Sequence, residues 1–277
     1  MRIFFISLFI CFTWVFSAIA QPSPASDHAN LRFLTEHKSV EAGSTIMAGL
    51  HIEMDEDWHV YWRNPGDSGI PVRIQWNENE HVTFGSIQWP YPTSFKTDHL
   101  VTYGYNDETL LFIPIEISGD AKPGIKNVEA RVEYLVCKEI CLPGFEDHTL
   151  QIDVSERATQ EVSDNSELFE KFSRKIPDES GNVSSYFSIK DNKLHLQLEG
   201  DFSDWGDIEN LYFYAGEENK IESSAGQNVR VSGNKIDIEL TLSRYINETF
   251  TSLYGVIVIP DGNTTRAIEI EATQKQS

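Results

Sequence analysis

The sequence predicts an all-β protein built as two antiparallel β-sandwich domains joined by a short helical linker segment. Short segments with alternating apolar and polar residues recur at close spacing on both sides of one polar stretch. Turn residues separate these segments, and no regular alternation of strands with helices is present. This pattern favours antiparallel sandwiches over a parallel sheet flanked by helices.

Residues 1–20 have the features of a secretory signal peptide. A basic start at Arg2 precedes an apolar run over 3–16, and Ala18-Ile19-Ala20 fits the small-residue cleavage pattern. We expect cleavage near Ala20 and a mature chain exported to the periplasm, where disulfides form and persist. The apolar run is short for a membrane span and no other is long enough, so we expect no stable membrane insertion.

The first predicted domain covers 21–155, and its strands follow from period-two alternation. Turn chemistry at Asn64-Pro65-Gly66 and Lys122-Pro123-Gly124 separates the segments. The apolar rows are Ile46, Ala48, Leu50, Ile52 and Met54; Ile70, Val72, Ile74 and Trp76; Leu111, Ile113, Ile115 and Ile117; and Val128, Ala130, Val132, Tyr134 and Val136.

The linker is predicted over 156–182 and the second domain over 183–277. Leu168, Phe169, Phe172 and Ile176 have helical spacing, which predicts one amphipathic helix that Asp164 or Ser166 would cap. The strands expected in the second domain span 185–190, 194–198, 211–214, 236–242, 256–259 and 267–271.

The charge balance excludes one class of partner. The chain has 22 Lys and Arg against 43 Asp and Glu, a formal net charge of −21. An acidic surface repels a phosphate backbone, so we expect no nucleic-acid role. The charge also disfavours small anionic thiols and leaves a protein as the preferred thiol partner.

Cys137 and Cys141 are the only thiols expected in the mature chain, because Cys11 lies in the signal peptide. They follow a predicted strand whose alternation puts Cys137 on the more polar face. If the strand continued, their Cα atoms would lie about 13 Å apart, beyond the ~7 Å limit for a disulfide. The chain must therefore bend between them before they can bond, and Pro143-Gly144 favours such a break.

The spacing leaves three interpretations of this pair open. Closing a loop of about five residues stabilises a fold by only about 2 kcal/mol, which favours a redox pair over a structural disulfide without excluding the latter. In a redox pair Lys138 would lower the thiolate pKa and Glu139 would raise it. As the third interpretation, the two thiolates with His59, His99 or His148 could handle copper.

Four motifs resemble the N-terminal periplasmic domain family of the thiol:disulfide interchange protein DsbD, in its ScsB-like branch. They are Trp-His-Val-Tyr-Trp-Arg-Asn-Pro-Gly-Asp-Ser-Gly at 58–69, Trp-Pro-Tyr-Pro at 89–92, Tyr-Gly-Tyr at 103–105 and Tyr-Leu-Val-Cys-Lys-Glu-Ile-Cys-Leu-Pro at 134–143. They keep the order of the family, and the segments at 211–215 and 221–227 resemble the second domain of the same branch.

The resemblance implies immunoglobulin-like sandwiches in which Cys137 and Cys141 alternate between dithiol and disulfide. Reducing equivalents would come from a thioredoxin-like periplasmic domain or a membrane reductase and pass to oxidised exported proteins, with no cofactor. The chain would then be an exchange partner of the protein-disulfide reductase type rather than an independent catalyst. In the DsbD branch the second cysteine attacks, which corresponds to Cys141.

Two departures from the DsbD branch bear on this expectation. Leu100-Val101-Thr102 stands where that branch has an Asp-Glu-Phe cap before the Tyr-Gly pair, so no Phe cap is expected at this position. The sequence also ends at Ser277 without membrane helices, so we expect the chain either to obtain electrons from a separate protein or to act without them.

Aromatic residues concentrate in the same motifs. Alternation puts Trp58 and Trp62 on one side of their strand, where we expect them in the core. His59 and Tyr61 fall on the other side. Together with Tyr103 and Lys138, these two residues are the predicted partner contacts beside the cysteines.

Overall fold

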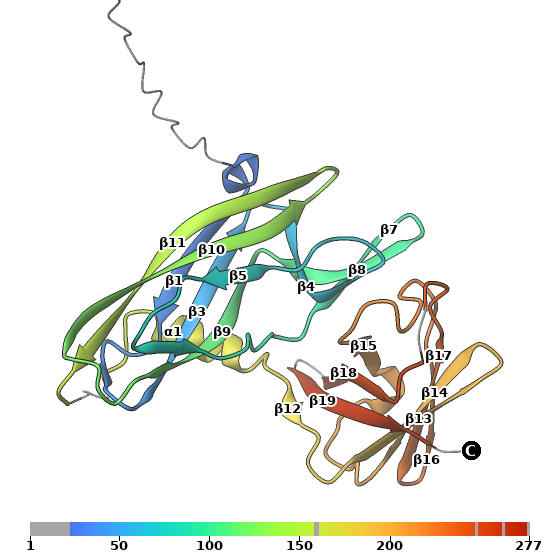
Figure 1. The fold of residues 1–277 in the computed structure, drawn as a ribbon. Coiled ribbons are helices and arrows are strands. Elements are labelled where there is room, and N and C mark those ends of the chain that lie inside the picture. The colour runs from blue at the N-terminus through green and yellow to red at the C-terminus, as the bar shows by residue number, and fades with distance from the viewer. Residues whose placement is uncertain (1–22, 158–160, 247–248, 262–263, 276–277) are drawn as a thin grey trace, which may run out of the picture.

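The computed structural model describes residues 23–157, 161–246, 249–261 and 264–275. It confirms the all-β class, with two immunoglobulin-like sandwich domains (Figure 1). The predicted signal peptide and Cys11 lie outside the described residues. Among the residues described, no helix has the length and apolarity needed to cross a membrane.

The first domain is a sandwich of two sheets. One sheet has the order β1-β3-β9-β6, and the other has the order β2-β11-β10-β4-β8-β7 with β5 on β10. The elements are η1 (Pro24–Asp27), β1 (Ala29–Thr35), β2 (Val40–Glu41), β3 (Thr45–Met54), β4 (His59–Gly66), β5 (Arg73–Trp76), β6 (Val82–Phe84), β7 (Thr93–Thr97), β8 (Leu100–Asn106), β9 (Glu108–Ile117), β10 (Gly124–Cys137) and β11 (Cys141–Ser155).

The linker and second domain follow. One curled sheet has the order β15-β18-β19-β13-β14-β17-β16, with β12 on β19. The elements are α1 (Ser166–Ser173), β12 (Asp178–Glu179), β13 (Ser184–Lys190), β14 (Lys193–Glu199), η2 (Ile208–Asn210), β15 (Tyr212–Ala215), β16 (Asn228–Ser232), β17 (Lys235–Thr241), β18 (Ser252–Asp261) and β19 (Thr264–Gln274). Most pairs are antiparallel, whereas β13 and β12 meet β19 in parallel.

Three of the four predicted apolar rows are confirmed as buried faces. The rows of β3, β9 and β10 all point into the core of the first domain. The row over 70–76 was wrong at its start, because β5 begins only at Arg73 and Ile70 is 48% exposed. The turn-rich stretch before β5 prevents the strand from starting earlier. The sequence pattern also did not predict β16, a short strand at one edge of the sheet of the second domain.

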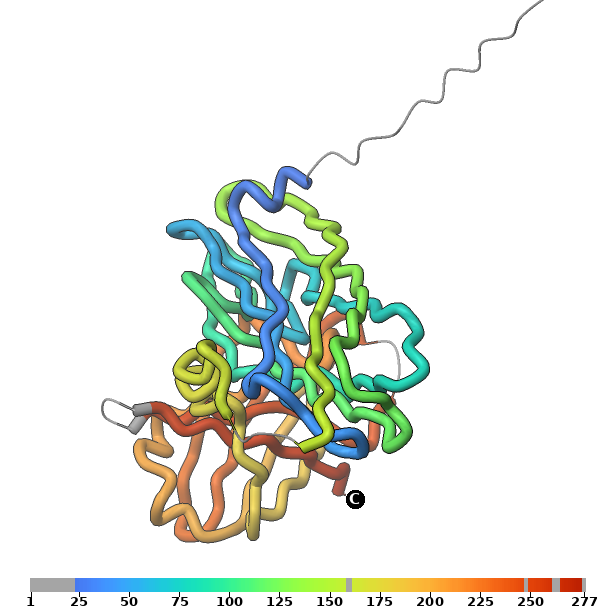
Figure 2. Tube along the Cα trace, turned by 90° about the vertical axis from the view of Figure 1, so that its left-hand side faces the viewer, coloured from blue at the N-terminus to red at the C-terminus, as the bar shows by residue number. Residues whose placement is uncertain are grey.

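Helix α1 confirms the helical linker and is tied to the first domain. Phe169 and Phe172 are buried against Leu110 and Phe112 of β9. The predicted cap was wrong: Asn165 occupies the N-cap position without a side-chain hydrogen bond. Figure 2 shows this segment, in yellow-green, where the chain passes from the first domain to the second.

The two domains share a buried, partly polar interface. Tyr214, Val256 and Ala267 of the second domain belong to the core cluster of the first. The Asn64 side-chain amide donates to the backbone oxygens of Ala215 (2.8 Å) and Glu217 (3.0 Å). The Asn-Pro-Gly segment at the end of β4 therefore holds the second domain.

Candidate redox site

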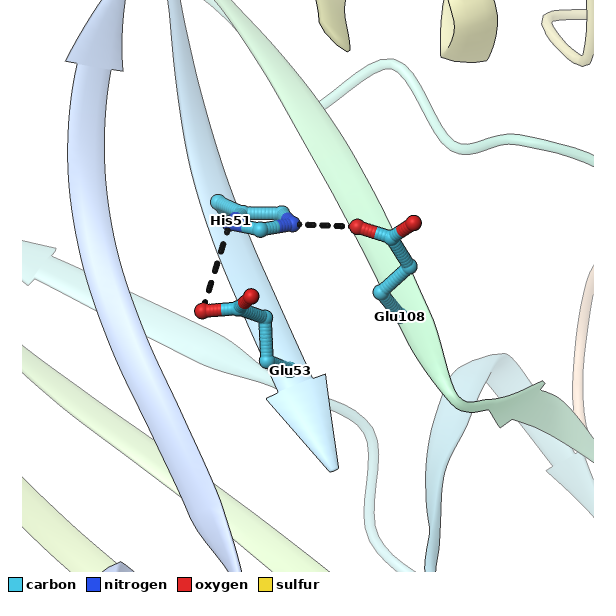
Figure 3. A group of neighbouring side chains, drawn as sticks. All are labelled: His51, Glu53 and Glu108. Atoms are coloured by element: carbon cyan, nitrogen blue, oxygen red, sulfur yellow. Dashed lines mark hydrogen bonds and ion pairs between the residues drawn. The ribbon is translucent and has the colours of Figure 1, made fainter. Parts of the chain in front are cut away.

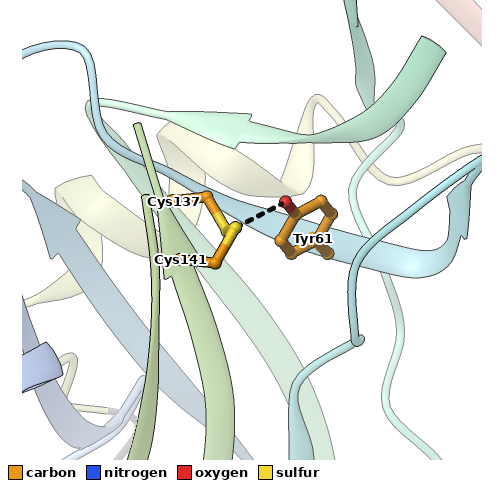
Figure 4. Close-up of a disulfide and its surroundings, with 3 residues drawn as sticks. All are labelled: Tyr61, Cys137 and Cys141. Carbon is orange, nitrogen blue, oxygen red and sulfur yellow. Dashed lines mark hydrogen bonds between the residues drawn. A yellow bond between two sulfur atoms is a disulfide. The ribbon is translucent and has the colours of Figure 1, made fainter. Parts of the chain in front are cut away.

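The two cysteines close the tip of the long β10–β11 hairpin. Cys137 and Cys141 are cross-strand partners, and Lys138 N donates to Ile140 O at 3.0 Å within the turn. Their Cα atoms lie 4.2 Å apart and their sulfurs form a disulfide (Figure 4). The predicted bend is thus a hairpin reversal, which brings together two residues that an extended strand would separate.

The two sulfurs belong to residues of very different exposure. Cys137 is 2% exposed, whereas Cys141 is an exposed residue. Alternation puts Cys137 in the row of β10 whose members Glu129 and Arg131 are exposed, yet Cys137 itself is buried at the end of that row. Within the sheet, its neighbour on the side away from Cys141 is His59 of β4, so Cys137 lies between two paired strands. An incoming thiolate therefore meets the Cys141 side of the disulfide first.

Tyr61 links β4 to the disulfide. Its hydroxyl lies 3.8 Å from Cys141 Sγ, and because a disulfide sulfur carries no hydrogen, the hydroxyl is the donor (Figure 4). Tyr61 is buried, and this burial raises the pKa of its hydroxyl, so the phenol stays protonated near neutral pH. The residue is a permanent hydrogen-bond donor to this sulfur.

A glycine holds the Tyr61 ring in place. A Cβ added at Gly69 would lie 2.3 Å from Tyr61 Cε1, and Gly69 has φ +117°. Only glycine allows both this close approach and this backbone conformation. The turn-rich stretch after β4 therefore supports the ring from the side and is more than a connection between strands.

His59 lies beside Tyr61 and carries an aromatic partner that sequence reasoning missed. Its ring stacks on Phe95 of β7 (4.8 Å between centroids, 17°) and meets Tyr61 edge-on at 5.2 Å. Burial lowers the pKa of His59, so its imidazole is neutral near pH 7. Phe95 pairs with Thr102 across the β7–β8 hairpin. The DsbD branch has its Phe cap at the position of Leu100-Val101-Thr102, where this sequence has no phenylalanine. Phe95 lies on the strand paired with that segment, so its place beside His59 depends on strand pairing.

The other two predicted partner contacts have different surroundings. Lys138 is exposed at the hairpin tip, where its ammonium pairs with Asp57 at 2.9 Å. That hydrogen bond raises the pKa of Lys138. Tyr103 is 0% exposed and contacts Tyr212 and Tyr214 at the domain interface. Tyr103 is therefore buried and presents no surface to a partner in this structure.

The copper interpretation gains no support from side-chain geometry. In the described part of the chain, the group of His, Cys, Asp and Glu residues with metal-ligand spacing is His51, Glu53 and Glu108, which contains no cysteine (Figure 3). His51 Nε2 lies 2.8 Å from Glu108. Arg32 contacts His51 and Glu53 at 3.1 Å each, and Lys171 pairs with Glu108. These cations balance the carboxylates, so the group is a structural charge network.

Comparisons with known proteins agree with this geometry. Residues 31–152 match the family described as thiol:disulfide interchange protein DsbD, N-terminal. A comparison with curated proteins found no match.

Among solved structures, the N-terminal periplasmic domain of ScsB from Proteus mirabilis is similar over 91% of this chain and 96% of that chain, with 19% identity and a TM-score of 0.63. A protein of unknown function from Porphyromonas gingivalis W83 covers 88% of this chain and 99% of its own, with 11% identity. Its TM-score of 0.26 is too low to carry an argument.

Proposed function

Because residues 31–152 form a domain of the DsbD N-terminal family, we propose that this chain is a periplasmic thiol-disulfide exchange module. It takes reducing equivalents from a thioredoxin-like donor or a membrane reductase and passes them to oxidised exported proteins. The observation that carries the proposal is the asymmetric disulfide at the hairpin tip, with Cys137 buried and Cys141 exposed.

Reduction proceeds by two exchanges. A donor thiolate attacks Cys141 Sγ, the bond between Cys141 and Cys137 breaks, and Cys137 leaves as a thiolate that takes up a proton. The donor's second thiolate then attacks its own sulfur in the mixed disulfide. Cys141 is released as a thiolate that takes up a proton, the donor becomes a disulfide, and this chain holds two thiols. Two electrons have passed from donor to chain.

In the second half of the cycle, the chain passes the two electrons to a client and returns to its disulfide form. The Cys141 thiolate attacks a client disulfide and displaces one client sulfur as a thiolate. Cys137, after losing its proton, attacks Cys141 Sγ and releases the second client sulfur. The Cys137–Cys141 bond re-forms and the client leaves as a dithiol. Tyr61 supports this step because its hydroxyl can donate to the Cys141 thiolate and stabilise it.

Trapping separates the two cysteines. With Cys137→Ala, the exposed Cys141 thiolate can attack the disulfide of an oxidised thioredoxin-like periplasmic protein and displace one of its sulfurs as a thiolate, and because no Cys137 remains to resolve the product, we expect a lasting mixed disulfide. With Cys141→Ala, the remaining Cys137 is buried, and we expect at least tenfold less trapping. Non-reducing gel electrophoresis and mass spectrometry measure the adducts. Failure of both variants to form any adduct would contradict the exchange function.

The structural-disulfide alternative has its own measurement. Redox titration of the folded chain gives the potential of the Cys137–Cys141 pair. A structural disulfide has a potential below about −300 mV, whereas an exchanging pair has a higher one. A value below that limit would favour the structural role.

A further inference from the structure

The hairpin tip and the turn beside it form one continuous exposed surface around the reactive sulfur. We call it the tip surface and define it as residues 138–141 of the hairpin tip and 55–57 of the turn between β3 and β4. Lys138 joins the two segments, because its ammonium pairs with Asp57 and contacts the backbone oxygen of Glu56 at 3.4 Å.

The tip surface includes one exposed apolar side chain. Ile140 is 61% exposed and directly precedes Cys141. Most large apolar side chains of the first domain are buried in its core clusters. A partner that reaches Cys141 therefore also contacts Ile140, and covering this side chain removes apolar area from water.

The tip surface also carries four carboxylates. Asp55, Glu56, Asp57 and Glu139 are all exposed. Lys138 is the cation between them and is already paired with Asp57, while His28 contacts Asp55 at 3.0 Å. The local formal charge is therefore negative, with the same sign as the net charge of −21 on the whole chain.

Resting on the exchange function proposed above, we propose that the tip surface docks a thiol protein whose reactive cysteine lies in an apolar depression bordered by Lys or Arg. Ile140 enters the depression and the basic border faces the carboxylates. Opposite charges steer the two proteins together and speed association, and the same field slows anionic thiols.

Two synthetic peptides test the charge argument. Each has one cysteine next to a leucine, flanked in one peptide by lysines and in the other by glutamates. The rate at which each reduces the Cys137–Cys141 disulfide is followed by mass spectrometry. At low ionic strength we expect the lysine peptide to react about tenfold faster, with the difference shrinking in 0.5 M salt as screening rises.

Variants assign the effect to the tip surface. The double change Glu56→Lys and Glu139→Lys should remove or reverse the preference, whereas Glu156→Lys, at an exposed position just past β11, should keep it. Ile140→Ser should slow both peptides severalfold. Ile125→Ser is the matched control, because Ile125 is 56% exposed near the other end of the hairpin.

The outcomes distinguish this inference from the exchange function itself. Equal rates for the two peptides, or a preference that survives the double change, would overturn the docking inference and leave exchange standing. A disulfide that neither peptide reduces in the folded chain would overturn both.

Discussion

At the scale of single residues, Tyr61 contacts Cys141, the exposed cysteine of the disulfide. Its hydroxyl lies 3.8 Å from Cys141 Sγ, and its ring packs against His59 and Gly69. Burial raises the pKa of the phenol, so it stays protonated near neutral pH in the proposed exchange cycle. It can therefore stabilise each thiolate that Cys141 forms.

The change Tyr61→Phe tests this role. It removes the hydroxyl and keeps the ring, so the pKa of the Cys141 thiol in the dithiol form should rise and the thiolate fraction at pH 7 should fall. We expect exchange to slow about tenfold, since a hydrogen bond to a charged group contributes about 1.5–3 kcal/mol and a 3.8 Å sulfur contact is at the weak end. The pH dependence of alkylation by iodoacetamide measures the thiol. An unchanged pH profile would show that the hydroxyl does not act on the thiolate.

Gly69→Ala tests the support of the ring. The new Cβ would overlap Tyr61, and the positive φ of +117° would strain the alanine. We expect a loss of about 3 kcal/mol in the free energy of unfolding, measured by denaturant titration. Gly119→Ala is the control, because no atom lies within 4 Å of the Cβ added there. Equal effects of the two changes would argue against a role for Gly69.

At the scale of elements, helix α1 is held to the first domain by an apolar contact and an ion pair. Phe169 meets Phe112 edge-on at 5.7 Å, and Lys171 pairs with Glu108 of β9. The hydrogen bond from Lys171 lowers the pKa of Glu108 below its ordinary value of 4.5. Both an apolar contact and an ion pair therefore hold the linker helix against the first domain.

The ion pair predicts a pH dependence. Because the pKa of Glu108 is lower in the folded state, its stabilising contribution is complete above about pH 4.5 and is lost as the pH falls through the folded value. We expect Glu108→Gln to lower the Tm at pH 7 and to flatten its fall in acid. Thermal unfolding by circular dichroism between pH 3 and 7 measures both. Parallel curves for variant and parent would contradict the assignment.

The apolar contact predicts a larger effect. Phe169→Ala removes a buried ring and should cost about 3–5 kcal/mol of unfolding free energy. Chemical denaturation measures this cost. Leu168→Ala, on the same helix but only partly buried, is the comparison and should cost clearly less.

At the scale of the whole molecule, one strand connects the redox site with the second domain. β4 begins at His59, opposite Cys137, and ends in the Asn-Pro-Gly segment that binds the second domain. Arg63, from the same strand, lies 4.3 Å above the Tyr254 ring. The second domain therefore contacts the strand that carries Tyr61.

Asn64→Ala tests the domain contact. It leaves the oxygens of Ala215 and Glu217 without this donor in the interface, which should cost about 1–3 kcal/mol. By calorimetry we expect one unfolding transition to split into two as the domains uncouple. Asn77→Ala, which removes an exposed hydrogen bond to Glu129 within the first domain, should leave a single transition. A single transition in both variants would contradict the role of Asn64.

Local pattern in the sequence was sufficient for the fold class and for much of the core. The rows in β3, β9 and β10 follow from alternation alone, because each of these strands has one face in the core. The spacing in α1 likewise identified its buried phenylalanines. The start of β5 could not be found this way, since turn residues ended the strand where apolar alternation continued.

The surroundings of the cysteines depend on contacts between residues far apart in the sequence. Alternation along β10 could not reveal that β4 pairs with it at Cys137, nor that Phe95 reaches His59 from another hairpin. Tyr103, like Tyr61, was predicted to lie beside the cysteines, yet it lies in the domain interface. Residue order shows which face of a strand a side chain takes, whereas strand pairing and domain packing determine what covers that face. Sequence thus identifies the Cys137–Cys141 pair, and packing makes Cys141 the accessible member.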